Sequence, residues 1–171
     1  MKLKQNIFTT LLLAIGLIMH QITPGILGGM KFDFLVIFMI VSILINSKFE
    51  NVILSGILAG ILSAMTTTFP GGQIPNIIDK IITSLALFAL VSCLHRFNIN
   101  TVIAGFFGSI GTFISGIIFL LSAAYIAGLP MPVEVLIRGI VIPTSLVNSI
   151  GTILIYKIVK KAARISGFAM I

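Results

Sequence analysis

Charged residues are scarce in this chain, and acidic residues are scarcer than basic ones. Only 9% of the 171 residues are charged, with 4 Asp and Glu against 11 Lys and Arg. An ordinary globular domain is about 25% charged. No segment is both long and polar enough to fold in water by itself. We therefore expect one integral transmembrane domain over residues 1–171 and no separate soluble domain.

Cysteine is nearly absent, and the patterns of catalytic or nucleotide-binding sites are missing. Cys93 is the only cysteine, which excludes an intramolecular disulfide and a cysteine-rich metal site. His20 has no acid or cysteine at ligand spacing, and no Gly-x-x-x-x-Gly-Lys pattern opens a helix. We expect no catalytic residues, no metal, no cofactor and no ATP binding by the chain itself, and hence no enzyme.

The chain instead contains long apolar stretches, and residues 51–78 and 97–133 carry no charge. A helix needs about 20 apolar residues to cross a hydrocarbon core of about 30 Å. Backbone amides in lipid must bond internally, and no alternation with a period of two indicates a barrel. The sequence predicts an all-α membrane bundle of six spans, at about residues 7–22, 34–46, 52–68, 77–94, 101–127 and 135–159.

Basic residues gather at one set of span ends. If the N-terminus is inside, eight bases lie in inner segments, and only Lys31, Lys80 and Arg138 lie in outer ones. This bias places both termini in the cytoplasm. Bases at segment ends are typical of a topological signal and argue against nucleic acid as a partner. Residues 1–4 resemble the start of a secretory signal, but we expect an uncleaved first span because no clear cleavage site follows.

Small residues recur four positions apart on three of the predicted spans. Helices in lipid associate by close packing at such positions. We expect the small residues of the third and fifth spans to pack inside the bundle. These are Gly56, Gly60 and Ala64 on the third span, and Gly108, Thr112 and Gly116 on the fifth. Thr10 and Ala14 form a similar pair on the first span.

A dense polar cluster interrupts the apolar pattern at residues 66–80, with the sequence TTTFPGGQIPNIIDK. Its prolines and glycines break the helix and leave backbone groups free. Irregular backbone at membrane depth is tolerated only where protein buries it or a cavity solvates it. Such a break is a typical pointer to a substrate site, and a simple outer loop is the alternative.

Two further segments repeat this mixture, at residues 27–34 (LGGMKFDF) and 143–148 (PTSLVN). Acids, bases, amides and rings on the outer side suit a zwitterion with an apolar body, such as an amino acid. Its carboxylate could pair with Lys31 or Lys80 and its ammonium with Asp33 or Asp79, while phenylalanines stack on its side chain. The candidate substrate-binding residues are Lys31, Asp33, Phe34, Thr67, Phe69, Gln73, Asn76, Asp79 and Asn148.

The segments at 27–34 and 66–80, together with the six-span layout, closely resemble the bacterial tryptophan transporter family TrpP. That family is in turn similar to the substrate-binding S components of energy-coupling factor transporters. The resemblance implies tryptophan uptake across the bacterial cell membrane, driven by a separate transmembrane scaffold subunit and two ATPase subunits. S components contact the scaffold through alanine-x-x-x-alanine on the first helix, and here Thr10 and Ala14 occupy that place.

Three alternatives to a partner-driven transporter remain open from the sequence. The chain could be a stand-alone secondary transporter of an aromatic amino acid or a related metabolite, although six spans are few for the usual inverted repeat. It could also be a non-transporting assembly or sensor subunit, with a purely structural polar cluster. An intramembrane enzyme would need polar catalytic groups at membrane depth, and the sequence shows none.

Overall fold

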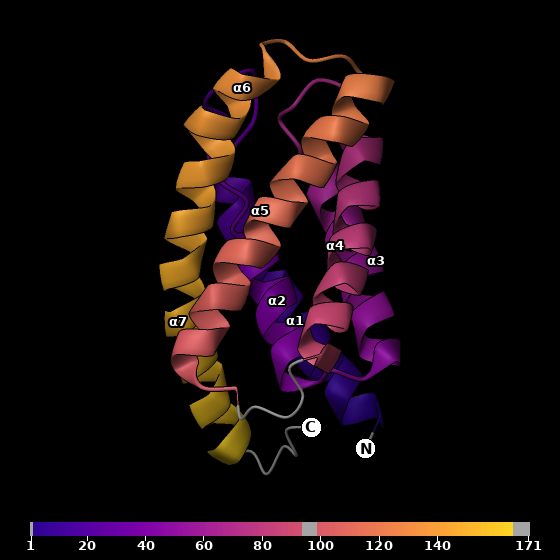
Figure 1. Ribbon diagram of the computed structural model, residues 1–171. Helices are drawn as coiled ribbons and strands as arrows, with labels where there is room; N and C mark the ends of the chain where they lie inside the picture. Colours follow the sequence, from indigo (N-terminus) through magenta and orange to yellow (C-terminus); the bar gives the residue numbers. More distant parts are fainter. Residues whose placement is uncertain (1, 94–98, 166–171) are drawn as a thin grey trace.

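The computed structural model describes residues 2–93 and 99–165, and every regular element in these ranges is a helix (Figure 1). Four continuous helical stretches are long and apolar enough to cross a membrane, and two helices of 11 and 17 residues are shorter. The all-helical membrane bundle predicted from the sequence is confirmed. The elements are α1 (Lys2–Ile22), α2 (Leu35–Ile45), α3 (Phe49–Met65), α4 (Gln73–Cys93), α5 (Thr101–Ile126), α6 (Val133–Leu136), η1 (Ile137–Val141) and α7 (Ile142–Ile165).

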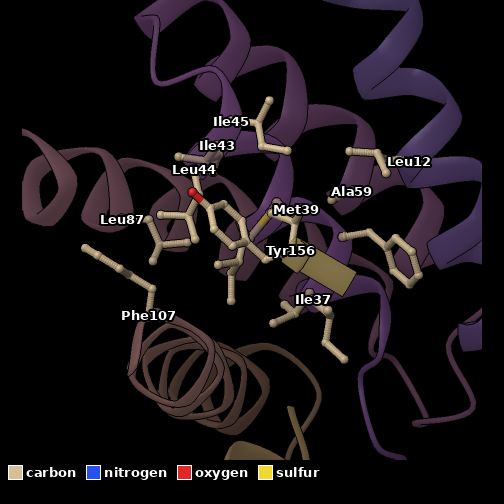
Figure 2. Packing of buried hydrophobic residues seen from close by; sticks show 14 of the residues in the cluster. Leu12, Ile37, Met39, Ile43, Leu44, Ile45, Ala59, Leu87, Phe107 and Tyr156 are labelled. Atoms are coloured by element: carbon tan, nitrogen blue, oxygen red, sulfur yellow. The ribbon is translucent and has the colours of Figure 1, made fainter. Parts of the chain in front are cut away.

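Helix α2 lies at the centre of the bundle. All of its residues are buried, and it packs against α1, α3, α4, α5 and α7 (Figure 2). Its one polar side chain, Ser42, is buried with hydrogen-bonding partners on α1 and α3. At 1.5 Å per residue, α2 is only about 16 Å long, roughly half the thickness of the hydrocarbon core. Its short length leaves space inside the bundle for the polar residues that precede it in the chain.

Glycines let neighbouring helices approach closely, as the small-residue patterns predicted. A Cβ on Gly56 of α3 would lie 2.3 Å from Ser84 Oγ on α4. A Cβ on Gly108 of α5 would lie 2.4 Å from Thr152 Oγ1 on α7. The structure therefore places these two glycines at internal helix contacts and not on the outer surface of the bundle.

Replacing Gly56 by valine should force α3 away from α4. Inserting atoms at a tightly packed contact costs about 1–3 kcal/mol, so the unfolding midpoint of the purified protein in detergent should fall clearly. Ile57→Val, on the exposed side of the same helix, is the matched control and should change the midpoint little. Equal midpoints for the two variants would show that α3 and α4 do not meet at Gly56.

Several predicted span ends were wrong. Helix α3 ends at Met65, so Thr67 and its neighbours lie beyond the helix and not on its last turn. Helix α4 begins at Gln73, four residues early, because Pro75 falls in the first turn, where a backbone N–H has no helical acceptor. Helix α1 already begins at Lys2, and the last helical stretch continues to Ile165. Residues 94–98, which include the last residue of the predicted fourth span, lie outside the described residues.

The last helical stretch contains a π-helical turn, η1, directly before Pro143. The backbone N–H of Ile142 donates to the carbonyl of Ile137, five residues earlier. Proline has no N–H to continue the α-helical pattern, and wider turns are common next to such a break. The start of α1 and the end of α7 lie at one end of the bundle, and residues 66–72 and 127–132 lie at the other (Figure 1).

Candidate functional site

A cavity lies in the part of the bundle that α2 does not fill. Its empty space, counted together with the open solvent at its mouth, is about 540 Å³. The wall is built by α1, α4, α5, η1, α7 and the connections at 23–34 and 66–72. The lining residues are His20, Gly29, Met30, Lys31, Asp33, Thr67, Thr68, Phe69, Asn76, Asp79, Lys80, Thr112, Ser115, Gly116, Phe119, Ile140, Val141 and Thr144.

Two carboxylates and one ammonium group meet in the cavity wall. Lys80 forms ion pairs with both Asp33, at 2.7 Å, and Asp79. Ser115 Oγ and Thr83 Oγ1 each donate a hydrogen bond of 2.9 Å to Asp79. Lys80 and Asp79 are each 1% exposed. Buried charges are costly unless they are paired, and in this cluster each carboxylate lies beside the ammonium group of Lys80.

The repeat of the α-helix turns Asp79 and Lys80 inward. The buried residues of α4 recur every three to four positions and form one continuous face: Pro75, Asn76, Asp79, Lys80, Thr83, Ser84, Leu87 and Val91. Helix α4 packs between α3 and α5, so a pair of adjacent residues can both point into the bundle. The first half of the face carries polar and charged residues, including Asp79 and Lys80, and its end carries the apolar Leu87 and Val91.

Asp33 reaches the cluster from the connection that precedes α2. Its Oδ1 lies 3.1 Å from His20 Nδ1, and its Oδ2 faces Lys80. Burial raises the pKa of the Asp33 carboxyl, but the charge of Lys80 and the contact with His20 outweigh burial and hold the pKa well below its ordinary value. The Asp33 side chain is therefore a carboxylate at neutral pH.

Lys31, in the same connection at 23–34, binds the ends of two helices. Its Nζ donates to the backbone carbonyls of His20, at 2.8 Å, and Thr66, at 2.7 Å. These carbonyls lie at the C-terminal ends of α1 and α3, where unpaired oxygens favour a cation. Burial lowers the pKa of Lys31, and the charge of Asp33 opposes this effect. Lys31 lines the cavity with a positive charge that no carboxylate neutralises directly among the described residues.

Two phenylalanine rings and two loops that contact each other, at residues 23–34 and 66–72, form another part of the cavity wall. The rings of Phe69 and Phe119 meet edge to face, with centroids 5.3 Å apart. Thr68 Oγ1 donates to the backbone carbonyl of Gly29 at 2.7 Å. Gly29 has a φ of +82°, and a Cβ there would lie 2.6 Å from the backbone oxygen of Thr68. Glycine is needed at this position because the loops touch through their backbones.

The structure brings six of the nine predicted binding residues together around the cavity: Lys31, Asp33, Thr67, Phe69, Asn76 and Asp79. The other three lie elsewhere. Phe34 packs on the apolar cluster around α2, Gln73 is exposed on the first turn of α4, and Asn148 is buried behind the wall. Direct contact with a substrate thus remains a prediction for the first six.

Sequence reasoning missed several lining residues. His20 was set aside for lack of a ligand partner at short spacing, but its partner Asp33 comes from the next connection. An ionisable residue within a predicted span is itself a functional signal, and this could have identified His20. Ser115, Thr112 and Phe119 carry no such signal, because hydroxyls and rings are common in membrane helices. Only the tertiary structure shows that they line the cavity.

The fold and the site define a multi-pass helical membrane protein with a cavity that combines charged, hydroxyl and aromatic groups. Among known proteins, the model of the tryptophan transporter family TrpP matches residues 2–164. The chain belongs to this family, whose members are transporters and not enzymes, and it lies in the bacterial cell membrane. The family resemblance seen in the sequence is confirmed.

Individual relatives agree with the family match over nearly the whole chain. A Bacillus subtilis protein named "probable tryptophan transport protein" is 44% identical over 168 residues, covering 98% of this chain and 97% of the relative. Proteins with the same name from Clostridium acetobutylicum and Clostridium perfringens are 43% and 39% identical, covering 96% and 90% of each chain. No solved structure matches the chain.

Proposed function

We propose that this chain binds tryptophan in the cavity and carries it into the cell. The observation that supports this most directly is the charge pattern of the wall. The wall has two carboxylates, Asp33 and Asp79, which share Lys80, while Lys31 stands apart on backbone carbonyls. The pattern is zwitterionic, like the backbone of an amino acid, so the site and its ligand can each remain neutral overall.

The two charged groups of the amino acid have different places in this proposal. The α-ammonium group binds beside Asp33 and Asp79, where negative charge exceeds positive charge. The α-carboxylate binds Lys31, which has one donor left after its two bonds to backbone carbonyls. These ion pairs gain strength when the loops exclude water from the cavity.

The indole ring binds on the aromatic side of the cavity. Phe69 and Phe119 offer an edge-to-face pair, and Ile140 and Val141 of η1 add apolar surface. An aromatic ligand stacked on such a pair gains about 0.5–1.5 kcal/mol beyond simple burial. Thr67 and Asn76 add polar groups to the lining of the cavity.

The cavity end of the bundle faces the outside, and both termini face the cytoplasm. This orientation is supported by the excess of bases at the other end of the bundle. Release to the inside then requires either an energised partner or an intrinsic alternating step. We favour energy-coupling factor subunits, a membrane scaffold and two ATPases, because Thr10 and Ala14 lie on the exposed face of α1.

Replacing Ala14 by tryptophan should separate transport from binding. The larger side chain would block close contact with a partner helix, so uptake should fall at least about tenfold while the affinity for tryptophan stays unchanged. Ile15→Trp is the control for a bulky residue in lipid, because Ile15 is also exposed but lies about 100° around α1 from Ala14. If Ala14→Trp takes up tryptophan at the normal rate, this face of α1 meets lipid and no partner.

Radiolabelled tryptophan uptake tests the proposed function in cells that lack other tryptophan carriers. Expression of the chain should restore saturable uptake, and deletion of candidate ATPase genes should abolish it. Uptake that survives these deletions would favour the stand-alone secondary transporter. A chain that inserts normally but takes up no tryptophan would contradict the proposal and favour a sensor or assembly subunit.

A further inference from the structure

Asn148 lies behind the cavity wall and connects two residues that line it. Its side chain has 0% exposure and is not among the lining residues. The Nδ2 group donates to the backbone oxygen of Asp33 at 2.9 Å and to Thr112 Oγ1 at 3.1 Å. One amide on α7 thus holds a residue of the connection before α2 and a residue of α5.

The contact with Asp33 determines which way the amide of Asn148 points. A backbone carbonyl only accepts hydrogen bonds, so the NH₂ group must face it. This orientation leaves Asn148 Oδ1 without a hydrogen-bond partner among the described residues. A buried acceptor without a partner costs about 1–3 kcal/mol, which an apolar residue of the same shape would avoid. What asparagine supplies here, and an apolar residue of the same shape would not, is the pair of hydrogen bonds that its Nδ2 donates to Asp33 and Thr112.

The packing of α5 against α7 holds Asn148 in place. Thr144, Asn148 and Thr152 recur four residues apart and form a buried polar stripe on α7. A Cβ on Gly108 of α5 would lie 3.0 Å from the backbone oxygen of Asn148, so the two helices touch at this level. Thr112, one turn further along α5, then meets the amide. The donor position is set by rigid helices and not by a loop.

Asp33, in contrast, belongs to the connection at 23–34, and the backbone N–H of Val36, in the first turn of α2, donates only a long hydrogen bond of 3.4 Å to its Oδ1. Its carboxylate faces Lys80 and His20 on one side. Its backbone carbonyl faces Asn148 on the other. Because both its carboxylate and its backbone carbonyl have partners, Asp33 keeps its carboxylate in one position. Loss of the bond from Asn148 to the carbonyl would let the connection at 23–34 shift.

We propose that Asn148 is a positioning residue for the binding site, which holds the main chain of Asp33 so that its carboxylate meets Lys80 and the ligand. Asn148 acts through Asp33 and does not itself touch the ligand. The identity of that ligand as tryptophan rests on the proposed function. The positioning role does not, because it can be measured on the protein without ligand.

The first test compares Asn148→Leu and Asn148→Asp by isothermal titration with tryptophan. Leucine keeps the shape but donates no hydrogen bond, so affinity should fall at least about tenfold. Aspartate donates only when its carboxyl group is protonated. The affinity of Asn148→Asp relative to wild type should therefore rise as the pH falls from about 8 to about 5, while that of Asn148→Leu stays flat.

Wild-type protein measured at each pH is the reference, because it carries the same charged side chains around Asp33 and binds the same ligand. Ser145→Ala is the matched control, because Ser145 is buried on α7 and its hydroxyl donates within the same helix, to Ile142. Its affinity should equal that of wild type. Unchanged affinity in Asn148→Leu, or an Asn148→Asp variant that is no better than leucine at any pH, would overturn the proposal. If the leucine variant does not fold, the pH profile of Asn148→Asp alone decides.

The second test is hydrogen exchange of the ligand-free protein in detergent. Amides of residues 29–34 should exchange faster in Asn148→Leu than in wild type, while those of α3 stay unchanged. Equal protection of residues 29–34 would show that Asn148 does not hold Asp33, whatever happens to binding. If wild-type protein binds no tryptophan but residues 29–34 still exchange faster in Asn148→Leu, the positioning role is supported and the proposed function is contradicted.

Discussion

Lys80→Met should both destabilise the protein and abolish tryptophan binding. Methionine has a similar length but leaves Asp33 and Asp79 as buried carboxylates without their shared cation. Removing one member of a buried ion pair costs about 3–5 kcal/mol. The unfolding midpoint in detergent should fall far below that of wild type, and titration with tryptophan should give no measurable heat of binding.

Two further variants separate charge from other effects of this substitution. Lys157→Met removes an exposed lysine of α7 and should leave stability and binding unchanged. Adding Asp79→Asn to Lys80→Met should restore part of the lost stability, because one uncompensated charge is gone, but should not restore binding. A Lys80→Met protein as stable as Lys157→Met would mean that the ion pairs with Asp33 and Asp79 do not exist.

Asp79→Asn should leave the fold intact and weaken tryptophan binding at least about 30-fold. The amide keeps the shape of the carboxylate and an oxygen for Thr83 or Ser115, but it removes the excess negative charge that attracts an ammonium group. Insertion into the membrane should be normal. Isothermal titration of the purified variant against tryptophan measures the loss.

Thr83→Val is the control for Asp79→Asn. It removes the hydrogen bond that Thr83 donates to Asp79 Oδ1 but keeps the charge, so the affinity should fall by no more than about tenfold. If Asp79→Asn binds tryptophan as tightly as wild type does, Asp79 does not belong to the binding site. A larger loss in Thr83→Val than in Asp79→Asn would equally contradict the role of charge.

The sequence predicted the parts of this protein that depend on local chemistry. Apolar length and charge placement predicted a helical bundle, and the broken segment at 66–80 predicted where the cavity lies. Asp79 could be predicted because an acid next to a proline-glycine break is rare in a membrane helix. The spacing of buried residues on α4 then follows from the helical repeat alone.

Other features depend on tertiary contacts and could not be read from spacing. Lys31 and Asp33 are close neighbours in the sequence, but Lys31 binds backbone carbonyls, and Lys80 forms ion pairs with both Asp33 and Asp79. Asn148 was predicted among the substrate-binding residues because its amide offers both donors and acceptors. The structure gives that amide a different partner, Asp33, more than a hundred residues away in the chain. Such pairings are set by how the helices pack.

Equilibrium binding of tryptophan to the purified wild-type protein tests the central claim most directly. Titration should show saturable binding, with much weaker binding of tryptamine, which lacks the carboxylate, and of indole-3-propionate, which lacks the ammonium group. Tryptophan that does not bind, or binding that is equally strong for all three compounds, would contradict recognition of an amino-acid zwitterion by this charged cavity.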